Sequence, residues 1–203
     1  MKIICIGRNY AEHAKEMNST LPTKPIFFLK PDTALFKDNN PFYIPDFTSE
    51  MHYECELVVR INKVGKNIQE KFAQKYYDEI GLGLDFTARD LQQNCKEKGF
   101  PWEIAKGFDN SALISNKFIK IDHNKINDLN FKLELNRQTV QEGNPNQMIF
   151  TIDQIIAYVS QFITLKTGDL IFTGTPSGVG SISIGDELKG FIKGEEFFNL
   201  EIK

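Results

Sequence analysis

The sequence predicts an α+β protein that is mostly β, and three observations support this fold class. Short apolar runs recur along the chain between clusters of glycine, proline, asparagine and aspartate, which is typical of strands joined by turns. Helical periodicity is confined to a few stretches. The 203 residues, 41% hydrophobic and 25% charged, fit one globular domain over residues 1–203, without a linker or an internal repeat.

Strands are predicted where apolar and β-branched residues lie between turn formers. They are residues 2–6, 26–30, 52–61, 80–85, 131–135, 138–141, 170–173, 186–192 and 196–202. Asn136-Arg137 is expected to form the turn of a hairpin, although neither residue is glycine. Residues 31–50 hold many turn formers, so we expect a structured loop with short strands inside it.

Four helices are predicted, at residues 11–17, 66–78, 91–98 and 152–163. Thr87 and Asp90 fit a capping box for the third helix, which should end at Gly99. Residues 101–109 are expected to be a loop. Thr151 should cap the fourth helix, whose isoleucine and valine residues form one apolar stripe.

The strand at 52–61 carries Glu54 and Glu56 two positions apart. Side chains alternate along a strand, so both carboxylates point to one face with His52 above them, while Tyr53 points into the core. Two carboxylates on a mostly apolar strand repel each other and resist desolvation, so positive charge between them is expected. For an isolated pair, a solvated sheet face without a role is the favoured alternative.

A third carboxylate weakens that alternative. Asp85 ends the apolar strand 80–85, and helix signals follow at once. Three carboxylates would form a metal site with open positions for water and substrate. Hard divalent cations prefer oxygen ligands, so Mg²⁺ or Mn²⁺ is expected, with Ca²⁺ as a further alternative.

Charge and composition exclude several classes of partner. The net charge is −3 and the sequence pI about 5.7, with no basic cluster, which argues against nucleic acid. No apolar run approaches the ~20 residues that span a bilayer, so no membrane partner is expected. The three cysteines are far apart, which favours reduced thiols in a cytoplasmic protein over disulfides or a zinc site.

Three further features could belong to an active site. His13 and Glu16 would share a helix face, where the carboxylate would set the tautomer of a histidine base; from spacing alone an exposed pair is favoured. Lys106 is a cation near the site or merely a solvated side chain, and alone the latter is favoured. The glycine-rich stretch 174–180 either lets the backbone approach a ligand closely or is a tight turn.

Together, these stretches resemble the fumarylacetoacetate hydrolase family, specifically its small acylpyruvase and oxaloacetate decarboxylase-like members. Each matching block is weak alone, but five of them occur in the family's order and span nearly the whole chain. The blocks are Gly7-Arg8-Asn9-Tyr10 with His13 and Glu16, Tyr53-Glu54-Cys55-Glu56-Leu57, Asp85-Phe86-Thr87-Ala88-Arg89-Asp90, Gly99-x-Pro101-Trp102 leading to Lys106, and Gly174-Thr175-Pro176-x-Gly178-Val179-Gly180.

The resemblance implies a mixed β-roll of layered sheets with a few peripheral helices, usually assembled as a homodimer. It also implies roles for ten residues: Glu54, Glu56 and Asp85 as metal ligands, His13 and Glu16 as a water-activating dyad on a lid segment, Lys106 as a catalytic lysine, and Arg8, Arg89, Gln92 and Thr175 as contacts to substrate oxygens. His52 is not a ligand in the family, so we expect it behind the ligands or in a structural role.

The activity that the resemblance implies is metal-dependent hydrolysis of a carbon–carbon bond in a small 2,4-dioxo acid, of the acylpyruvate or fumarylpyruvate type, through a metal-bound pyruvate enolate. Oxaloacetate decarboxylation, oxaloacetate tautomerisation and isomerisation of 2-hydroxyhepta-2,4-diene-1,7-dioate are the alternatives on the same scaffold, because each passes through the same or a related enolate. The predicted dyad favours hydrolysis, which alone needs an activated water. A binding module without catalysis is the remaining alternative.

Overall fold

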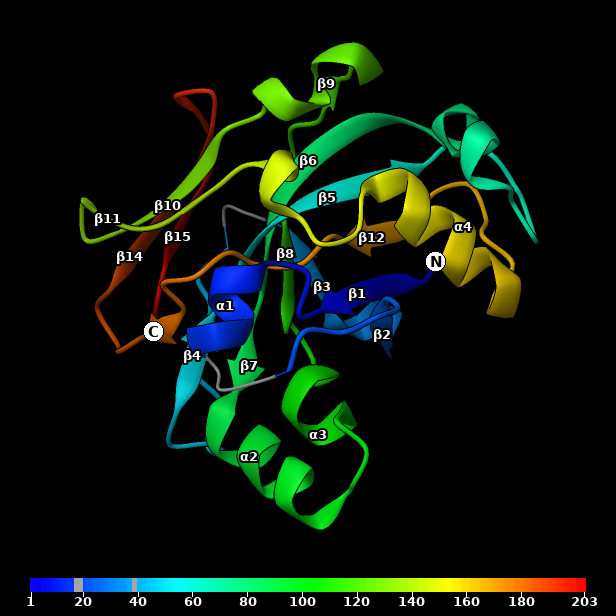
Figure 1. The fold of residues 1–203 in the computed structure, drawn as a ribbon. Coiled ribbons are helices and arrows are strands. Elements are labelled where there is room, and N and C mark those ends of the chain that lie inside the picture. Colours follow the sequence, from blue (N-terminus) through cyan, green and yellow to red (C-terminus); the bar gives the residue numbers. More distant parts are fainter. Residues whose placement is uncertain (17–19, 38–39) are drawn as a thin grey trace.

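A computed structural model describes residues 1–16, 20–37 and 40–203, and in these ranges the chain forms three sheets with short helices around them (Figure 1). The predicted α+β, mostly β class is confirmed. The strands are β1 (Ile3–Gly7), β2 (Ile26–Lys30), β3 (Leu35–Lys37), β4 (Met51–Tyr53), β5 (Cys55–Ile61), β6 (Tyr77–Asp85), β7 (Thr87–Ala88), β8 (Ala112–Ile114), β9 (Ile119–Lys120), β10 (Phe131–Leu135), β11 (Gln138–Gly143), β12 (Leu170–Phe172), β13 (Gly180–Ser181), β14 (Glu187–Ile192) and β15 (Glu195–Glu201).

The helices are short. They are the α-helices α1 (Ala11–Glu16), α2 (Arg89–Lys98), α3 (Glu103–Lys106) and α4 (Ile152–Phe162), and the 3₁₀ helices η1 (Asp32–Ala34), η2 (Glu70–Tyr76), η3 (His123–Asp128) and η4 (Pro145–Gln147). Within the described ranges, no helix is long and apolar enough to cross a membrane.

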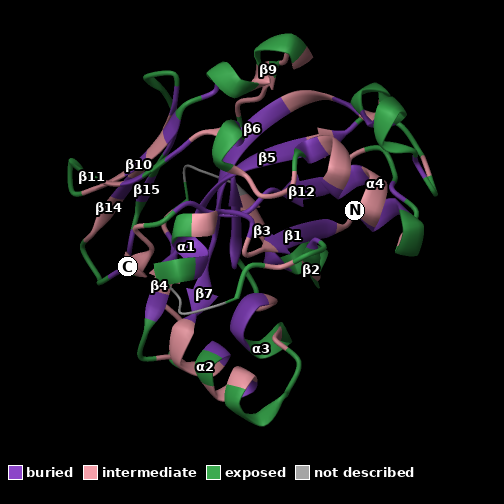
Figure 2. Cartoon of the chain, in the orientation of Figure 1, coloured by how far each residue is buried: buried purple, intermediate pink, exposed green. Residues whose placement is uncertain are grey.

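The largest sheet positions the site. Its strands follow the order β2-β1-β12-β5-β6-β8-β3, with β9 added beside β6. The pairs β1–β12 and β3–β8 are parallel and the others antiparallel. The sheet β11-β10-β14-β15 lies to one side of it, and the small sheet β13-β4-β7 lies near α1 and α2 (Figure 1). Figure 2 shows that the central strands β5 and β6 are almost wholly buried.

Alternation along β5 divides the core between the two faces of the large sheet. Leu57 belongs to the larger apolar cluster, whereas Val58 belongs to a smaller cluster with Cys5 and Phe172. Glu56 and Val58 are two residues apart, so they point to the same face. The acidic side chains therefore lie beside the smaller cluster, at the end of the strand.

Two local predictions in the C-terminal half are confirmed. Asn136 and Arg137 join β10 to β11 with φ values of 51° and 69°, the left-handed pair that a two-residue hairpin turn requires. Thr151 caps α4, because its side chain accepts a hydrogen bond from the Gln154 N–H and its own backbone N–H donates to the Gln154 side-chain oxygen.

The predicted continuous strand at 52–61 is wrong at one position. The chain leaves the small sheet after β4, passes through Glu54, and enters the large sheet as β5. The Cys55 N–H marks the change, because it donates to the Gln141 side chain at 2.9 Å. The break places Glu54 between two sheets, and its side chain still lies beside that of Glu56.

The predicted helix at 66–78 is also wrong. Residues Glu70–Tyr76 form the 3₁₀ helix η2, and Tyr77 already begins β6. Tyr77 is buried, and its hydroxyl donates to Asp153 of α4 at 2.9 Å. This tertiary contact favours the strand over another helical turn.

The capping box predicted for the third helix is wrong, although the helix itself is confirmed. Thr87 lies in β7 and donates to the Asp85 carbonyl, while Ala88 occupies the capping position without a side-chain bond. The loop predicted at 101–109 contains the short helix α3. Met17, the last residue of the predicted first helix, and residues 38–39 of the predicted loop lie outside the described residues.

Candidate active site

Three carboxylates meet at one end of the central strands. Glu54 and Glu56 reach this point from the β5 segment, and Asp85 reaches it from the end of β6, where its N–H donates to the Glu54 carbonyl at 2.8 Å. One oxygen atom from each carboxylate lies within 4.8 Å of the others, and all three side chains are buried. The antiparallel register of β5 and β6 thus brings together the three residues predicted as metal ligands.

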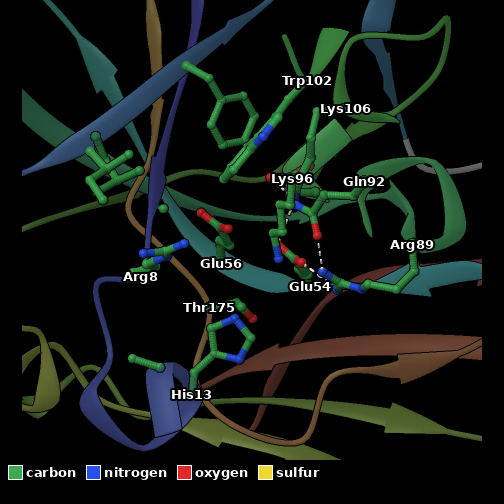
Figure 3. A pocket seen from close by; sticks show the side chains of 16 residues that line it. Arg8, His13, Glu54, Glu56, Arg89, Gln92, Lys96, Trp102, Lys106 and Thr175 are labelled. Carbon is green, nitrogen blue, oxygen red and sulfur yellow. Dashed lines mark hydrogen bonds and ion pairs between the residues drawn. The ribbon is translucent and has the colours of Figure 1, made fainter. Parts of the chain in front are cut away.

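Lys106 of α3 joins two of these carboxylates. Its ammonium donates to Glu54 Oε2 at 2.8 Å and to Asp85 Oδ2 at 2.9 Å (Figure 3). Burial by itself would lower the pKa of Lys106, but Asp85 and Glu54 outweigh it and raise that pKa above its usual range. The alternative of a solvated lysine is wrong, because the residue is only 3% exposed.

A second buried lysine was not anticipated from the sequence. The ammonium of Lys30, at the end of β2, lies 2.7 Å from Asp85 Oδ1 and donates to the hydroxyl and carbonyl of Ser111 and to the carbonyl of Lys106. The apolar residues at 26–30 predict a strand but indicate no role for Lys30. A lysine directly before Pro31 does not by itself indicate an ion pair with a carboxylate that is distant in sequence.

The surroundings of Glu54 and Glu56 shift their pKa values in opposite directions. Burial would raise the pKa of Glu54, but Lys106 and Arg89 outweigh it and hold that pKa well below its usual range. Glu56 accepts a hydrogen bond from the Gly174 N–H at 2.7 Å and pairs with no cation among the described residues. Burial, followed by repulsion from Asp85 and Glu54, raises the pKa of Glu56 well above its ordinary value.

The donor set fits a hard divalent cation. All three groups offer oxygen, which Mg²⁺ and Mn²⁺ prefer. Asp85 Oδ1 is already met by the Lys30 ammonium at 2.7 Å, whereas Glu56 forms no ion pair among the described residues and lies beside two further carboxylates. A divalent cation would supply positive charge there and lower the pKa of Glu56.

Arg89 is fixed by three partners at the start of α2. Its guanidinium donates to Glu54 Oε1 at 2.7 Å, to Gln92 Oε1 at 2.7 Å and to His52 Nδ1 at 3.3 Å. Burial, followed by the Arg89 charge, lowers the pKa of His52, which keeps a lone pair available to accept from Arg89. His52 therefore lies behind the carboxylates, in a supporting position.

The predicted dyad is assembled. His13 Nδ1 lies 3.2 Å from Glu16 Oε2, and the Gly178 N–H donates to the same carboxylate at 3.2 Å. His13 is only 7% exposed and lines the pocket over Glu54 and Glu56. The alternative of a merely exposed pair is therefore wrong for His13, whereas Glu16 remains partly open to solvent.

The remaining predicted contacts, Arg8 and Thr175, also line this pocket. Arg8 follows β1 with a left-handed φ of 58° and forms no hydrogen bond or ion pair with any residue that the structure describes. The Thr175 hydroxyl donates to the Cys55 carbonyl at 2.9 Å and accepts from the Gln141 amide at 2.8 Å. The first bond holds the glycine-rich turn against β5, and the second holds it against β11.

Lys96 and Trp102 are among the residues that line the pocket and that the sequence did not assign to the site. Lys96 lies on α2, and Trp102 lies just before α3, with the Lys96 ammonium 5.9 Å from the Trp102 ring centroid. Helical spacing from Arg89 could have indicated Lys96. The pocket is small and partly open to solvent, which suits a small ligand.

Comparisons with known proteins agree with this geometry. The family model described as fumarylacetoacetate (FAA) hydrolase, C-terminal, matches residues 2–203. The chain is 44% identical over 204 residues to the mitochondrial oxaloacetate tautomerase of Mus musculus, covering 99% of this chain and 91% of that protein. It is 42% identical over 194 residues to the mitochondrial oxaloacetate decarboxylase of Dictyostelium discoideum, covering 95% of this chain and 89% of that protein.

A solved structure is similar to this chain over its full length. The crystal structure of fumarylpyruvate hydrolase from Pseudomonas aeruginosa in complex with Mn²⁺ and pyruvate superposes with a TM-score of 0.92 at 35% identity. The match covers 100% of this chain and 89% of that chain.

Proposed function

Because the chain belongs to the fumarylacetoacetate hydrolase family, we propose that it is a divalent-metal-dependent enzyme that interconverts the keto and enol forms of oxaloacetate. The observation that carries this proposal is the buried triad Glu54, Glu56 and Asp85, found in a chain 44% identical to an oxaloacetate tautomerase. Decarboxylation of oxaloacetate is the neighbouring activity, because loss of carbon dioxide leaves an enolate of the same kind.

The residues present can each perform a part of the reaction. The triad would hold Mg²⁺ or Mn²⁺, which as a Lewis acid polarises a carbonyl and stabilises negative charge on its oxygen. Lys106 adds positive charge at the same place, and Arg8 and Arg89 are suited to carboxylate oxygens. His13, oriented by Glu16, is the candidate base for the proton on the methylene carbon between the 2-oxo group and the second carboxylate of oxaloacetate.

Hydrolysis of a fumarylpyruvate-type dioxo acid is the second candidate. It is favoured by the His13–Glu16 contact, since a histidine oriented by a carboxylate can activate water, and by the likeness to fumarylpyruvate hydrolase. The two candidates share the triad and Lys106. They differ in whether the base takes a proton from carbon or from water.

A substrate panel tests the proposal. Purified protein with Mg²⁺ or Mn²⁺ would be assayed for loss of the ultraviolet absorbance of enol-oxaloacetate, for carbon dioxide release, and for pyruvate release from fumarylpyruvate and acylpyruvates. We expect tautomerisation to be the fastest reaction relative to a blank that holds the same metal concentration. An Asp85→Asn variant is the protein control. Tautomerisation no faster than in the blank would refute the proposal, and faster pyruvate release from a dioxo acid would establish the second candidate.

A further inference from the structure

Lys96 shares one face of α2 with two residues already placed in the site. Arg89, Gln92 and Lys96 are spaced three and four residues apart, which aligns their side chains along one side of a helix. All three line the pocket. Figure 3 shows the Lys96 side chain extending toward Glu54, from the same side of the pocket as Gln92 and Arg89.

The charges around the pocket are unbalanced. Five cationic side chains stand in or against it and face the three carboxylates of the triad: Arg8, Lys30, Arg89, Lys96 and Lys106. Lys30, Arg89 and Lys106 each form an ion pair with a triad carboxylate. In the described part of the chain, Arg8 and Lys96 form none. A divalent cation at the triad would add still more positive charge, so the ligand that completes the site should carry more than one negative charge.

The Lys96 ammonium lies at the pocket without an ion-pair partner among the described residues. It lies over the face of Trp102, 5.9 Å from the ring centroid, and the side chain is half-buried. An aromatic ring can hold the stem of a lysine while the ammonium keeps its donors for a ligand. Partial burial of an unpaired cation costs free energy unless an anion meets it there.

A 2-oxo acid would use its first carboxylate and its 2-oxo oxygen at the triad cation. We propose that Lys96 binds the second carboxylate of a dicarboxylic oxo acid and is therefore a specificity-determining residue of this site. The inference rests on the proposed function only in requiring an oxo acid at the triad. It holds whether the reaction is tautomerisation, decarboxylation or hydrolysis.

Binding of two matched, stable ligands tests the assignment without turnover. Malate and lactate both offer a 2-hydroxy acid group to the metal, and malate adds one carboxylate. Both enantiomers of each would be titrated calorimetrically into protein loaded with Mg²⁺. We expect wild type to prefer malate, and Lys96→Met to weaken malate binding by about 10- to 100-fold, the range of one charge-assisted hydrogen bond, with lactate affinity changed less than about twofold.

Three variants make the result specific. Lys98→Met removes a lysine that is exposed on the same helix, so it controls for the loss of one positive charge and should bind both ligands as wild type does. Lys96→Arg should keep a preference for malate. Arg8→Met tests the other unpaired cation.

The outcomes separate the two proposals. Equal loss of malate and lactate in Lys96→Met, no loss of malate, or a malate-specific loss in Arg8→Met instead of Lys96→Met would overturn the role of Lys96. Absence of any Mg²⁺-dependent binding of either ligand to wild type would count against both the proposed function and this inference. Melting temperatures of the unliganded variants exclude misfolding as a cause.

Discussion

Glu54 and Glu56 are two residues apart, yet their surroundings move their pKa values in opposite directions. Glu54 has two cationic partners, Lys106 and Arg89, which outweigh the effect of burial. Glu56 has a single backbone N–H from Gly174 and two carboxylate neighbours. The pKa of Glu56 is therefore raised in the protein without metal, and a divalent cation would compete with a proton for this carboxylate.

The raised pKa of Glu56 predicts a pH dependence of stability. Its folded pKa lies above the unfolded value of about 4.3. Above that value the unfolded chain binds fewer protons than the folded one, so this group's contribution to stability is lost as pH rises. With metal removed by chelation, we expect the free energy of unfolding to fall more steeply between about pH 5 and pH 8 for wild type than for Glu56→Gln.

Urea unfolding at a series of pH values measures both curves, and the difference between them isolates Glu56 from other titrating groups. Parallel curves would show that Glu56 is already ionised in the folded protein. The cation would then bind without releasing its proton.

His13 separates the candidate reactions. We expect His13→Ala to lower tautomerisation of oxaloacetate and any hydrolysis of fumarylpyruvate by about 100-fold or more, the size of a general-base contribution. Decarboxylation should change little, because it needs no proton abstraction. The measurement is kcat/KM with Mg²⁺ for each substrate.

Glu12→Ala is the matched control for that experiment. Glu12 is exposed on the same helix and pairs with Lys15, so this variant should behave as wild type. Unchanged tautomerisation and hydrolysis in His13→Ala would show that the histidine is not the base.

The turn between β12 and β13 connects parts of the site that come from distant segments. Its backbone donates from Gly174 to Glu56 and from Gly178 to Glu16, so it holds a triad carboxylate and the dyad carboxylate at once. The sequence allowed two interpretations of this stretch, and a tight turn alone does not account for these two hydrogen bonds. Its glycines also let the backbone approach both acidic side chains.

Gly178→Ala tests how much this turn contributes. Gly178 has a φ of 92°, and an added Cβ would overlap the Val140 carbonyl oxygen. Gly185 has a similar φ of 95° but free space around the added atom. We expect Gly185→Ala to cost only the left-handed conformation, about 1–2 kcal/mol, and Gly178→Ala to cost clearly more.

Urea unfolding gives both values. Gly178→Ala should also reduce the activities that depend on Glu16. Equal destabilisation of the two variants would mean that the Val140 segment moves aside without cost.

At the scale of the whole molecule, metal binding should stabilise the fold. Asp85 is distant in sequence from Glu54 and Glu56, and the three carboxylates converge only in the folded chain, so the cation binds the folded state in preference. At a metal concentration 100 times Kd this linkage contributes about 2.7 kcal/mol, or about 5–11 °C in the melting temperature for a chain of this size.

Differential scanning fluorimetry with Mg²⁺, with Mn²⁺ and with a chelator measures the shift. Asp85→Asn should lose it, while Asp109→Asn, at an exposed position, should keep it. The same melting temperature with and without metal would argue against a divalent site.

The homodimer and the cytoplasmic location stay predictions. Light scattering on the purified protein would test the homodimer.

The sequence by itself determined the features that local rules control. Alternation along a strand places Glu54 and Glu56 on one face, and the apolar strand ending at Asp85 marks a third acidic group. The cap at Thr151 and the hairpin turn at Asn136-Arg137 follow from nearby residues as well. The ordered blocks also indicated the family.

Only the tertiary structure decided which cations meet these acids. Lys30 lies 55 positions before Asp85, and nothing in its spacing predicts their ion pair. The break at Glu54 and the early start of β6 were missed because each depends on contacts with distant strands and helices. The physical reason is that periodicity reports the direction of a side chain, whereas its charged partners, and therefore its pKa, are set by which segments the fold packs together.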